Sequence, residues 1–212
     1  MKRFYVLVVA LAMAVCQTSY AQRIQEMASE VVVRYGDYLN NVYAVRVFVD
    51  MNINDYDTAV YAIGCRSAEN LLPVVIFFNG KRELQSFVNE LKAIRDKYAE
   101  WLAVAQSNEV TKLDKVLPTQ ISARKLTYYD GNMEELKTVI MPMKALFRAE
   151  YSSLSLLPVK NITFGFAETE PEAIPIFHVC SVEDLDQILS TLDIEQIKQN
   201  VDAKVKTSNL FN

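Results

Sequence analysis

The sequence predicts an α+β fold, a largely antiparallel sheet built from two similar β-β-β-α units with helices packed on one side. Three observations lead to this prediction. A long stretch repeats apolar residues at three- and four-residue spacing, which is typical of an amphipathic helix. Alternating apolar segments, typical of strands, precede it. The same arrangement recurs in part about a hundred residues further along the chain.

The N-terminal segment resembles an export signal. Lys2 and Arg3 precede an apolar run, residues 4–16, and small residues follow up to Ala21. This order indicates a secretory signal peptide over residues 1–21 with cleavage near Ala21. The apolar run is shorter than the roughly 20 residues that a membrane-spanning helix needs. We therefore expect a secreted or periplasmic protein whose mature chain has no transmembrane span.

The expected mature chain, residues 22–212, is long enough for a single α+β domain. Loss of two basic residues with the signal peptide takes the net charge from −4 to −6. Hydrophobic residues make up 51% of the chain, with only 5 Gly and 6 Pro, so the composition is that of a globular protein. Nucleic-acid binding is not expected, because no cluster of Lys and Arg supplies the necessary positive surface.

The cysteines leave their redox state open. Signal cleavage would remove Cys16 and leave Cys65 and Cys180, which could form one disulfide in an oxidising compartment or remain as buried thiols. Two alternatives to cleavage also remain, a retained N-terminal anchor and a lipid attached to Cys16. The second is disfavoured because Val15 stands where lipoproteins usually have a small residue.

The clearest predicted element is a long helix from about Lys81 to Gln106. Its apolar stripe consists of Leu84, Phe87, Val88, Leu91, Ile94, Tyr98, Trp101, Leu102 and Ala105. The preceding apolar run from Leu71 to Phe78 is typical of a strand covered on both faces. Asn79 and Gly80 then interrupt the run, so the helix begins directly after it.

A second strand and helix follow the same pattern. An apolar strand is expected from Ile174 to Cys180, and Ser181 with an acid three residues later predicts a helix cap. Four apolar positions match the long helix at a constant offset of 101 residues, namely Leu185, Ile188, Leu189 and Leu192. The match then fails, so we expect this helix to end near Thr191. A separate helix from Ile194 to Val205, capped by Asp193, should follow.

Two further strands are expected before each apolar strand. They are Tyr43–Met51 and Thr58–Cys65 in the first half, and Met143–Tyr151 and Asn161–Ala167 in the second. The order strand, strand, strand, helix therefore occurs twice and suggests an internal duplication over about residues 42–106 and 143–206. The alternation of the earliest strands fits the offset only if one residue was gained or lost. We expect the third strand of each unit to lie centrally in the sheet.

The other segments give weaker signals. Residues 22–39 fit a helix stripe, although Val31-Val32-Val33 also favours a strand, and we lean towards the helix. Residues 110–117 and 121–129 are predicted strands, and Asp130-Gly131-Asn132 is a turn signal that closes them.

The only histidine, His178, lies two residues before Cys180 on a predicted strand. Neighbours on one strand face are roughly 6.5–7 Å apart, too far for a thiolate–imidazole pair that needs about 3 Å. Adding Cys65 could complete a zinc site, but the paired CxxC or HxxxH spacings are absent. We therefore expect His178 to be structural, and we predict no catalytic, cofactor-binding or metal-binding residue.

Two acidic segments carry oxygen-bearing side chains. Residues Asp50–Asp57 place oxygen-bearing side chains at positions one, three and five of a calcium loop, but lack its glycine and glutamate, so an ordinary polar hairpin explains the same residues more simply. Glu168, Glu170 and Glu172 could supply paired carboxylates for glycoside cleavage, although acids around a proline usually form a solvated turn.

With no assembled catalytic set, the sequence favours an exported noncatalytic binding or interaction protein whose partner is an unknown protein or envelope component. Two alternatives stay open. One is an extracytoplasmic carboxylate-dependent hydrolase, because acids are abundant and histidine is nearly absent. The other is a structural subunit of an envelope assembly.

Overall fold

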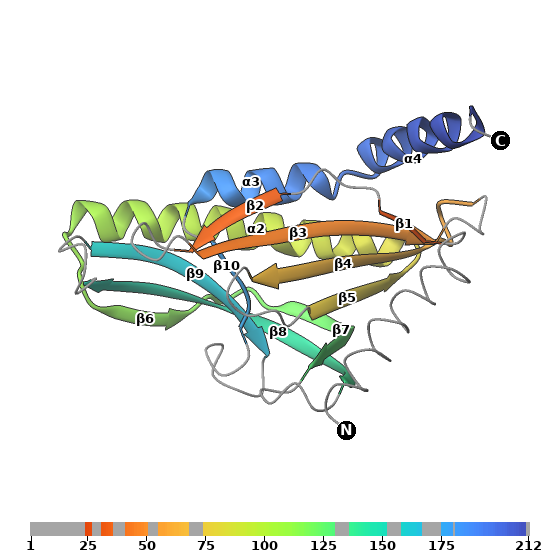
Figure 1. Ribbon diagram of the computed structural model, residues 1–212. Coiled ribbons are helices and arrows are strands. Elements are labelled where there is room, and N and C mark those ends of the chain that lie inside the picture. The colour runs from red at the N-terminus through yellow and green to blue at the C-terminus, as the bar shows by residue number, and fades with distance from the viewer. Residues whose placement is uncertain are drawn as a thin grey trace, which may run out of the picture.

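The computed structural model describes residues 24–26, 31–35, 41–50, 55–67, 74–129, 136–151, 158–166, 175–179 and 181–210. The strands there are β1 (Ile24–Glu26), β2 (Val31–Tyr35), β3 (Asn41–Asp50), β4 (Val60–Ser67), β5 (Val74–Asn79), β6 (Leu113–Val116), β7 (Ile121–Tyr129), β8 (Leu136–Tyr151), β9 (Pro158–Phe166) and β10 (Pro175–Val179). The helices are α2 (Lys81–Ser107), α3 (Val182–Thr191) and α4 (Ile194–Asn209). Figure 1 shows their arrangement.

The described strands form one sheet of ten strands, and every strand pairing in it is antiparallel. The strand order is β1-β3-β4-β5-β7-β8-β9-β10, with β2 also paired to β3 and β6 also paired to β8. Most consecutive strands are neighbours, because short connections permit hairpins but not the crossovers that parallel pairing requires. The predicted α+β class with a largely antiparallel sheet is confirmed.

The two apolar strands that precede helices occupy different places in the sheet. Strand β5 lies between β4 and β7, in the middle as expected. Strand β10 lies at one end of the strand order, so its predicted central position is wrong. The sheet nevertheless bends so that β10 contacts β2 and β4, and α3 lies beside it (Figure 1). These contacts explain how a strand at the end of the order can be so apolar.

The helix favoured for residues 22–39 is also wrong. The described parts of this segment form β1 and β2, and both pair antiparallel with β3. Val31, Val32 and Val33 begin β2 and pair with Val45, Ala44 and Tyr43. β-Branched side chains lose rotamer freedom in a helix but pack well on a sheet, and the ten-residue β3 offers both strands a hydrogen-bonding edge.

The start of α2 depends on a glycine. Gly80 has φ of 88°, and a Cβ atom there would lie 2.7 Å from the carbonyl oxygen of Asp57. This close approach lets the Gly80 N–H donate to the Ala59 carbonyl and the Lys81 N–H donate to the Asp57 carbonyl. A residue with a side chain would strain the backbone and separate these segments, so the turn ties the helix to the chain before β4.

The apolar stripe of α2 faces the main core. Its members Leu84, Phe87, Val88, Leu91, Ile94, Tyr98 and Ala105 are buried, and Trp101 and Leu102 are partly buried. The Phe87 ring lies 5.0 Å from that of Phe78 on β5. Tyr98 and Trp101 both contact Phe147 on β8, with ring centroids 6.0 and 5.9 Å away. The helix therefore packs against strands from both halves of the chain.

The two C-terminal helices begin where the sequence places them. The Ser181 hydroxyl accepts a hydrogen bond from the Asp184 N–H at 3.1 Å, and α3 ends at Thr191 as expected. The Asp193 carboxylate accepts from the Gln196 N–H at 2.9 Å and so caps α4, which continues beyond the expected Val205. Both caps use a short side-chain oxygen to satisfy a backbone N–H that has no partner within the helix.

Helices α2 and α3 are joined by an ion pair on the surface. Arg95 donates from Nε and Nη2 to the two carboxylate oxygens of Asp186, both at 2.9 Å. The hydrogen bonds from Arg95 hold the pKa of Asp186 below its ordinary value of 3.8 and raise the pKa of Arg95. Parallel two-point bonding of this kind fixes the orientation of both side chains.

Among the described residues, no helix combines the length and apolar character needed to cross a membrane.

Replacing Trp101 by Ala should lower the free energy of unfolding by about 3 kcal/mol, because the indole contacts Phe147 within the core. Val104→Ala is a matched control on the same helix, since the Val104 side chain is 54% exposed and should contribute little. Urea unfolding followed by circular dichroism measures both. Equal effects would mean that the indole adds nothing to the core.

Replacing Asp186 by Asn should make unfolding less sensitive to acid. Because the folded-state pKa of Asp186 is depressed, its stabilising effect is complete above the ordinary value of 3.8 and is lost as the pH falls through the folded value. The stability difference between wild type and variant should therefore shrink as the pH falls from about 5 to about 2. Urea unfolding at each pH tests this. When Arg95 is also replaced by Gln, the stability difference between Asp186 and Asn at position 186 should be smaller, because the partner of the carboxylate is absent. A difference that does not change with pH would contradict the role of the pair.

Candidate functional site: a polar groove along α2

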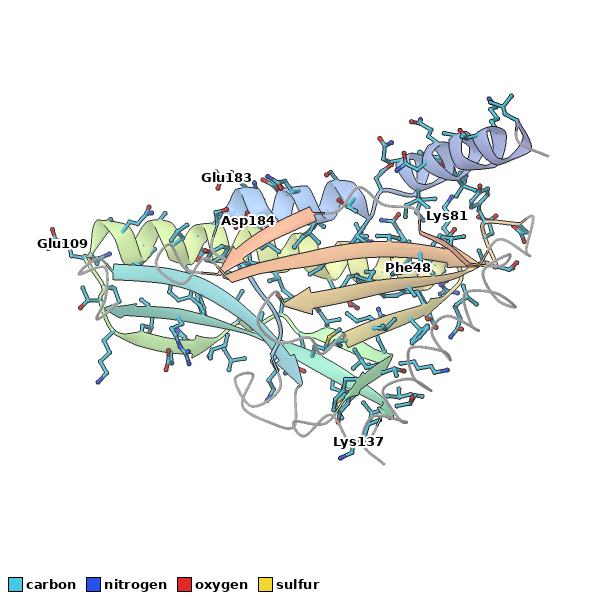
Figure 2. All side chains as sticks on the ribbon, in the orientation of Figure 1. Phe48, Lys81, Glu109, Lys137, Glu183 and Asp184 are labelled. Atoms are coloured by element: carbon cyan, nitrogen blue, oxygen red, sulfur yellow. The ribbon has the colours of Figure 1, made fainter. Side chains whose placement is uncertain are left out.

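A groove of about 780 Å³ follows the solvent-facing side of the first half of α2. It is lined by Asp57, Lys81, Arg82, Gln85, Ser86, Asn89, Glu90, Ala93 and Thr119. The helical members recur every three or four residues, which places them in one row beside the apolar stripe. Figure 2 shows Lys81 at the N-terminal end of this row. Asp57 comes from the turn before β4, and Thr119 from the connection between β6 and β7.

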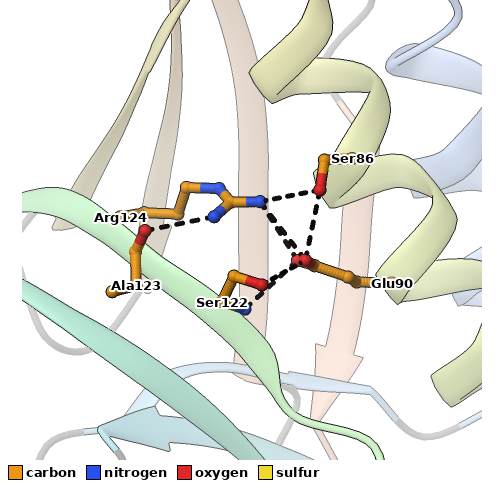
Figure 3. A network of polar contacts seen from close by, with 5 residues as sticks. All are labelled: Ser86, Glu90, Ser122, Ala123 and Arg124. Atoms are coloured by element: carbon orange, nitrogen blue, oxygen red, sulfur yellow. Dashed lines mark hydrogen bonds and ion pairs between the residues drawn. The ribbon is translucent and has the colours of Figure 1, made fainter.

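An ion pair between Arg124 and the groove residue Glu90 lies between the groove and the sheet (Figure 3). Arg124 on β7 is 8% exposed, and its Nη2 lies 3.2 Å from Oε2 of Glu90. The Glu90 carboxylate also accepts from the Ser122 hydroxyl at 2.6 Å, from the Ser122 N–H at 3.3 Å and from the Ser86 hydroxyl at 3.3 Å. The Arg124 Nη1 donates to the Ala123 carbonyl at 3.1 Å. This network connects α2 to the beginning of β7.

A bulge places Arg124 on the inner face of the sheet. Leu126 and Tyr128 alternate with Arg124 along β7 and are buried, so all three share one face. Ile121 is also buried although it is out of phase with them, and the pairing of β7 with β8 shifts register between Ile121 and Arg124. The extra residue lets an apolar and a charged side chain both face inward.

Within the network, one polar atom has no partner. The Nε of Arg124 is buried and makes no hydrogen bond among the described residues. A buried guanidinium is costly unless it is paired, so Glu90 is needed for Arg124 to remain in this position. The primary role of the pair is therefore to fix the helix against the sheet and to hold the groove wall rigid.

The charges of the groove are unevenly distributed. Lys81 lies 3.9 Å from Asp57, and Glu90 pairs with Arg124. Within the described part of the chain, Arg82 has no ion-pair partner although its side chain is exposed in the first turn of α2. The N-terminus of a helix carries partial positive charge, which adds to that of the guanidinium. This end of the groove therefore holds the cation Arg82 together with the Lys81–Asp57 pair.

The geometry is poorly suited to acid–base chemistry by two carboxylates. Asp57 lies at the start of α2 and Glu90 nine residues after Lys81, which corresponds to about 13 Å along the helix. Paired carboxylates in glycoside cleavage lie about 5–10 Å apart. Glu90 is also already occupied by several donors. The two carboxylates of the groove therefore do not form such a pair.

Most residues considered from the sequence lie outside the described part of the structure. Cys180, Glu168, Glu170 and Glu172 are not described, nor is the turn at residues 130–132. For His178 and Cys65 the structure gives the backbone alone, with His178 paired to Thr163 and Cys65 paired to Val45 and Val74. The disulfide, the zinc site and the thiolate–imidazole pair thus stay untested predictions.

The calcium-like loop is described only at its ends. Asp50 ends β3, and Asn52 and Asn54 lie outside the described residues. The Asp55 carboxylate accepts from the Asp57 N–H at 2.9 Å and from the Thr58 hydroxyl at 3.0 Å. These bonds are typical of an aspartate that closes a polar turn. Among the described residues, no group of three His, Cys, Asp or Glu side chains is placed to hold a metal ion.

Comparison with protein families, with curated proteins and with solved structures found no match for this chain.

Sequence reasoning missed both members of the buried pair. One signal was present, because Arg124 alternates with Leu126 and Tyr128 and therefore belongs to the apolar face of its strand. A cation on such a face requires a carboxylate nearby. The sequence does not indicate that this partner is Glu90, which lies 34 residues earlier on a different element.

Replacing Glu90 by Leu should destabilise the protein by about 3–5 kcal/mol, because it leaves the Arg124 charge buried and unpaired. The double variant Glu90→Leu with Arg124→Met removes both charges and should recover most of this loss. Thermal and urea unfolding of the two single variants and the double variant measure the coupling. If the two single losses simply add in the double variant, the pair does not act as a unit.

Proposed function

We propose that this chain is an exported, noncatalytic binding protein that holds an extended polypeptide segment in the groove along α2. The observation that carries the proposal is the row of polar side chains fixed on a rigid helix, backed by the Arg124–Glu90 pair. Because the helix is anchored by its buried stripe, the row keeps its spacing when a ligand arrives. Preorganised polar groups lose little entropy on binding.

The spacing along the helix favours a peptide. Gln85 and Asn89 lie one turn apart, about 6 Å along the axis. In an extended peptide the groups that point to one side repeat every two residues, or about 6.6 Å. The side-chain amide of Gln85 donates to the side-chain oxygen of Asn89 at 3.2 Å. This leaves the side-chain N–H groups of Asn89 and the side-chain oxygen of Gln85 available to a ligand. These groups complement the carbonyl and N–H groups of a peptide backbone.

The charge of the groove suggests how the peptide is oriented. Arg82 is the cation of the groove that has no ion-pair partner within the described residues. A carboxylate of the ligand, at its C-terminus or on an acidic side chain, would occupy this end. Arginine binds carboxylates with two parallel hydrogen bonds, so it contributes direction as well as affinity.

We also propose that the scaffold arose by duplication of one β-β-β-α unit. The strand registers support this. Ala62 on β4 pairs with Phe77 on β5, and Thr163 on β9 pairs with His178 on β10, so both partners recur 101 residues later. The first strands of the two units follow a different offset. Val45 on β3 pairs with Cys65, and Met143 on β8 pairs with Phe166. Cys65 and Phe166 are 101 residues apart, but Val45 and Met143 are only 98 residues apart. An odd difference between the two offsets explains why the alternation of those strands does not fit 101.

In the proposed scaffold the helices cover the inner side of the sheet. The contacts of Phe87 with Phe78 and of Tyr98 with Phe147 support this for α2. Its contacts with α3 support a place for the shorter helix beside it. Export through the signal peptide at residues 1–21 completes the proposal and would place the groove outside the cytoplasm, where it meets secreted or envelope polypeptides.

Titration of the exported protein with acetylated tetra-alanine tests the groove. The peptide with a free carboxylate should bind more tightly than its C-terminal amide, and Arg82→Gln should remove the difference by removing the charge that distinguishes them. Asn89→Ala should weaken both peptides alike. Nuclear magnetic resonance shift changes on titration give the affinities.

Lys92→Gln is the matched control, because Lys92 is an exposed cation of α2 outside the groove. It should leave both affinities unchanged. Equal affinity of the acid and the amide for the wild type would contradict the role of Arg82. Cleavage of the peptide during the titration would favour the hydrolase alternative instead.

A further inference from the structure

The outer face of the sheet, opposite the core, carries a continuous row of side chains across five strands. The strand registers join Phe48 on β3 to Ala62 on β4, Ala62 to Phe77 on β5, Phe77 to Lys125 on β7, and Lys125 to Ile140 on β8. Paired residues of neighbouring strands point to the same side. Figure 2 labels Phe48 on β3, at one end of this row, which we call the outer row.

The outer row is apolar and accessible. Phe48, Ala62 and Phe77 are half-buried, and Ile140 is 75% exposed. Their neighbours along the strands belong to the inner face, since Val47, Val49, Ile63, Ile76 and Phe78 are all buried in the main core. The next row on the outer side adds Gly64, Val75 and Thr127. Small residues on β4 therefore lie between the aromatic side chains of β3 and β5.

Positive charge accompanies this apolar surface. Lys125 is exposed within the row, and its ammonium lies 5.4 Å from the centre of the Phe77 ring. Lys144 on β8 alternates with the buried Met143 and Ala145, so it lies on the same outer side. From β3 to β8 neither row contains an acidic residue, and the first acid in the register is Glu26 on β1, which pairs with Phe48 at the end of the row far from Lys125. The surface thus combines apolar contacts with unbalanced lysines, although the whole chain is acidic.

We propose that the outer row binds an amphipathic segment of a partner protein that carries carboxylates beside its apolar residues. Apolar side chains of the segment pack over Ala62 and Gly64 between Phe48 and Phe77. Its carboxylates pair with Lys125 and Lys144. Burial of the aromatic rings provides affinity, and the lysines determine which segments are accepted, because charge complementarity mainly provides specificity.

Charge favours an acidic protein segment over two other possible occupants, a second copy of the chain and an anionic membrane. A second copy would bring two lysine-bearing faces together, and the first acid that the strand register offers to either face is Glu26 on β1, four strands from Lys125. An anionic membrane would attract the lysines but repel the remainder of the expected mature chain, whose net charge is −6 after loss of two basic residues from a total of −4. An acidic protein segment satisfies the lysines without either penalty.

The test uses the exported protein and two labelled peptides. One contains leucine and glutamate in helical spacing, and the other has lysine in place of every glutamate. Fluorescence anisotropy should show binding of the glutamate peptide alone. Lys125→Glu should weaken it by about tenfold, because the substitution turns attraction into repulsion. Phe77→Ser should also weaken it, by removing apolar contact.

Lys92→Glu is the control for charge reversal, since Lys92 is exposed on α2 and lies away from the outer row. It should leave binding unchanged, and the melting temperature of each variant reports whether the fold is kept. Equal binding of both peptides, or binding unaffected by Lys125→Glu and Phe77→Ser, would overturn the proposal. Tighter binding to phosphatidylglycerol vesicles than to the peptide, or a dimer in sedimentation that Lys125→Glu dissociates, would overturn it as well.

Discussion

The burial of one helix stripe is the constraint on which the structure depends. Helix α2 places its apolar residues against strands of both halves of the chain, from Phe78 on β5 to Phe147 on β8. Removing this helix from the sheet would expose the largest side chains of the core at once. Burial of one large apolar side chain contributes about 1.5–3 kcal/mol, and the stripe of α2 buries several of them together.

The same packing creates the groove. Because the apolar side of α2 is buried in the core, its polar residues lie in a row beside the sheet. Glu90 lies at the boundary between the two sides, where it can reach Arg124 on β7. The pair contributes little to net stability compared with apolar residues of similar size, but it fixes the position of the helix along the strand. Specific placement, more than stability, is what a binding surface requires.

Local features of the fold were predictable from the sequence, and features that depend on distant pairing were not. The stripe of α2, the cap at Ser181 and the cap at Asp193 each involve residues within a few positions of one another. Strands β1 and β2 were missed because the helix stripe over residues 22–39 was preferred to the strand signal of Val31-Val32-Val33, whereas pairing with β3 decides their conformation. Arg124 lies in phase with Leu126 and Tyr128, but its partner Glu90 comes from a different element, and only the fold brings the two side chains together.

The edge strand β6 shows how the fold limits unwanted association. All four of its side chains are exposed, and two of them, Leu113 and Val116, are apolar. Strand β6 of a second copy could extend the sheet by antiparallel pairing with β6. Residues that face the same side of the sheet must then lie opposite each other, and the central registers of this kind place Asp114 opposite Asp114 or Lys115 opposite Lys115. Like charges directly opposite each other are destabilising. Asp114 is further held by Arg148 at 3.1 Å, and Lys115 lies over the Trp101 ring. Charged side chains at this edge therefore oppose its pairing with another strand.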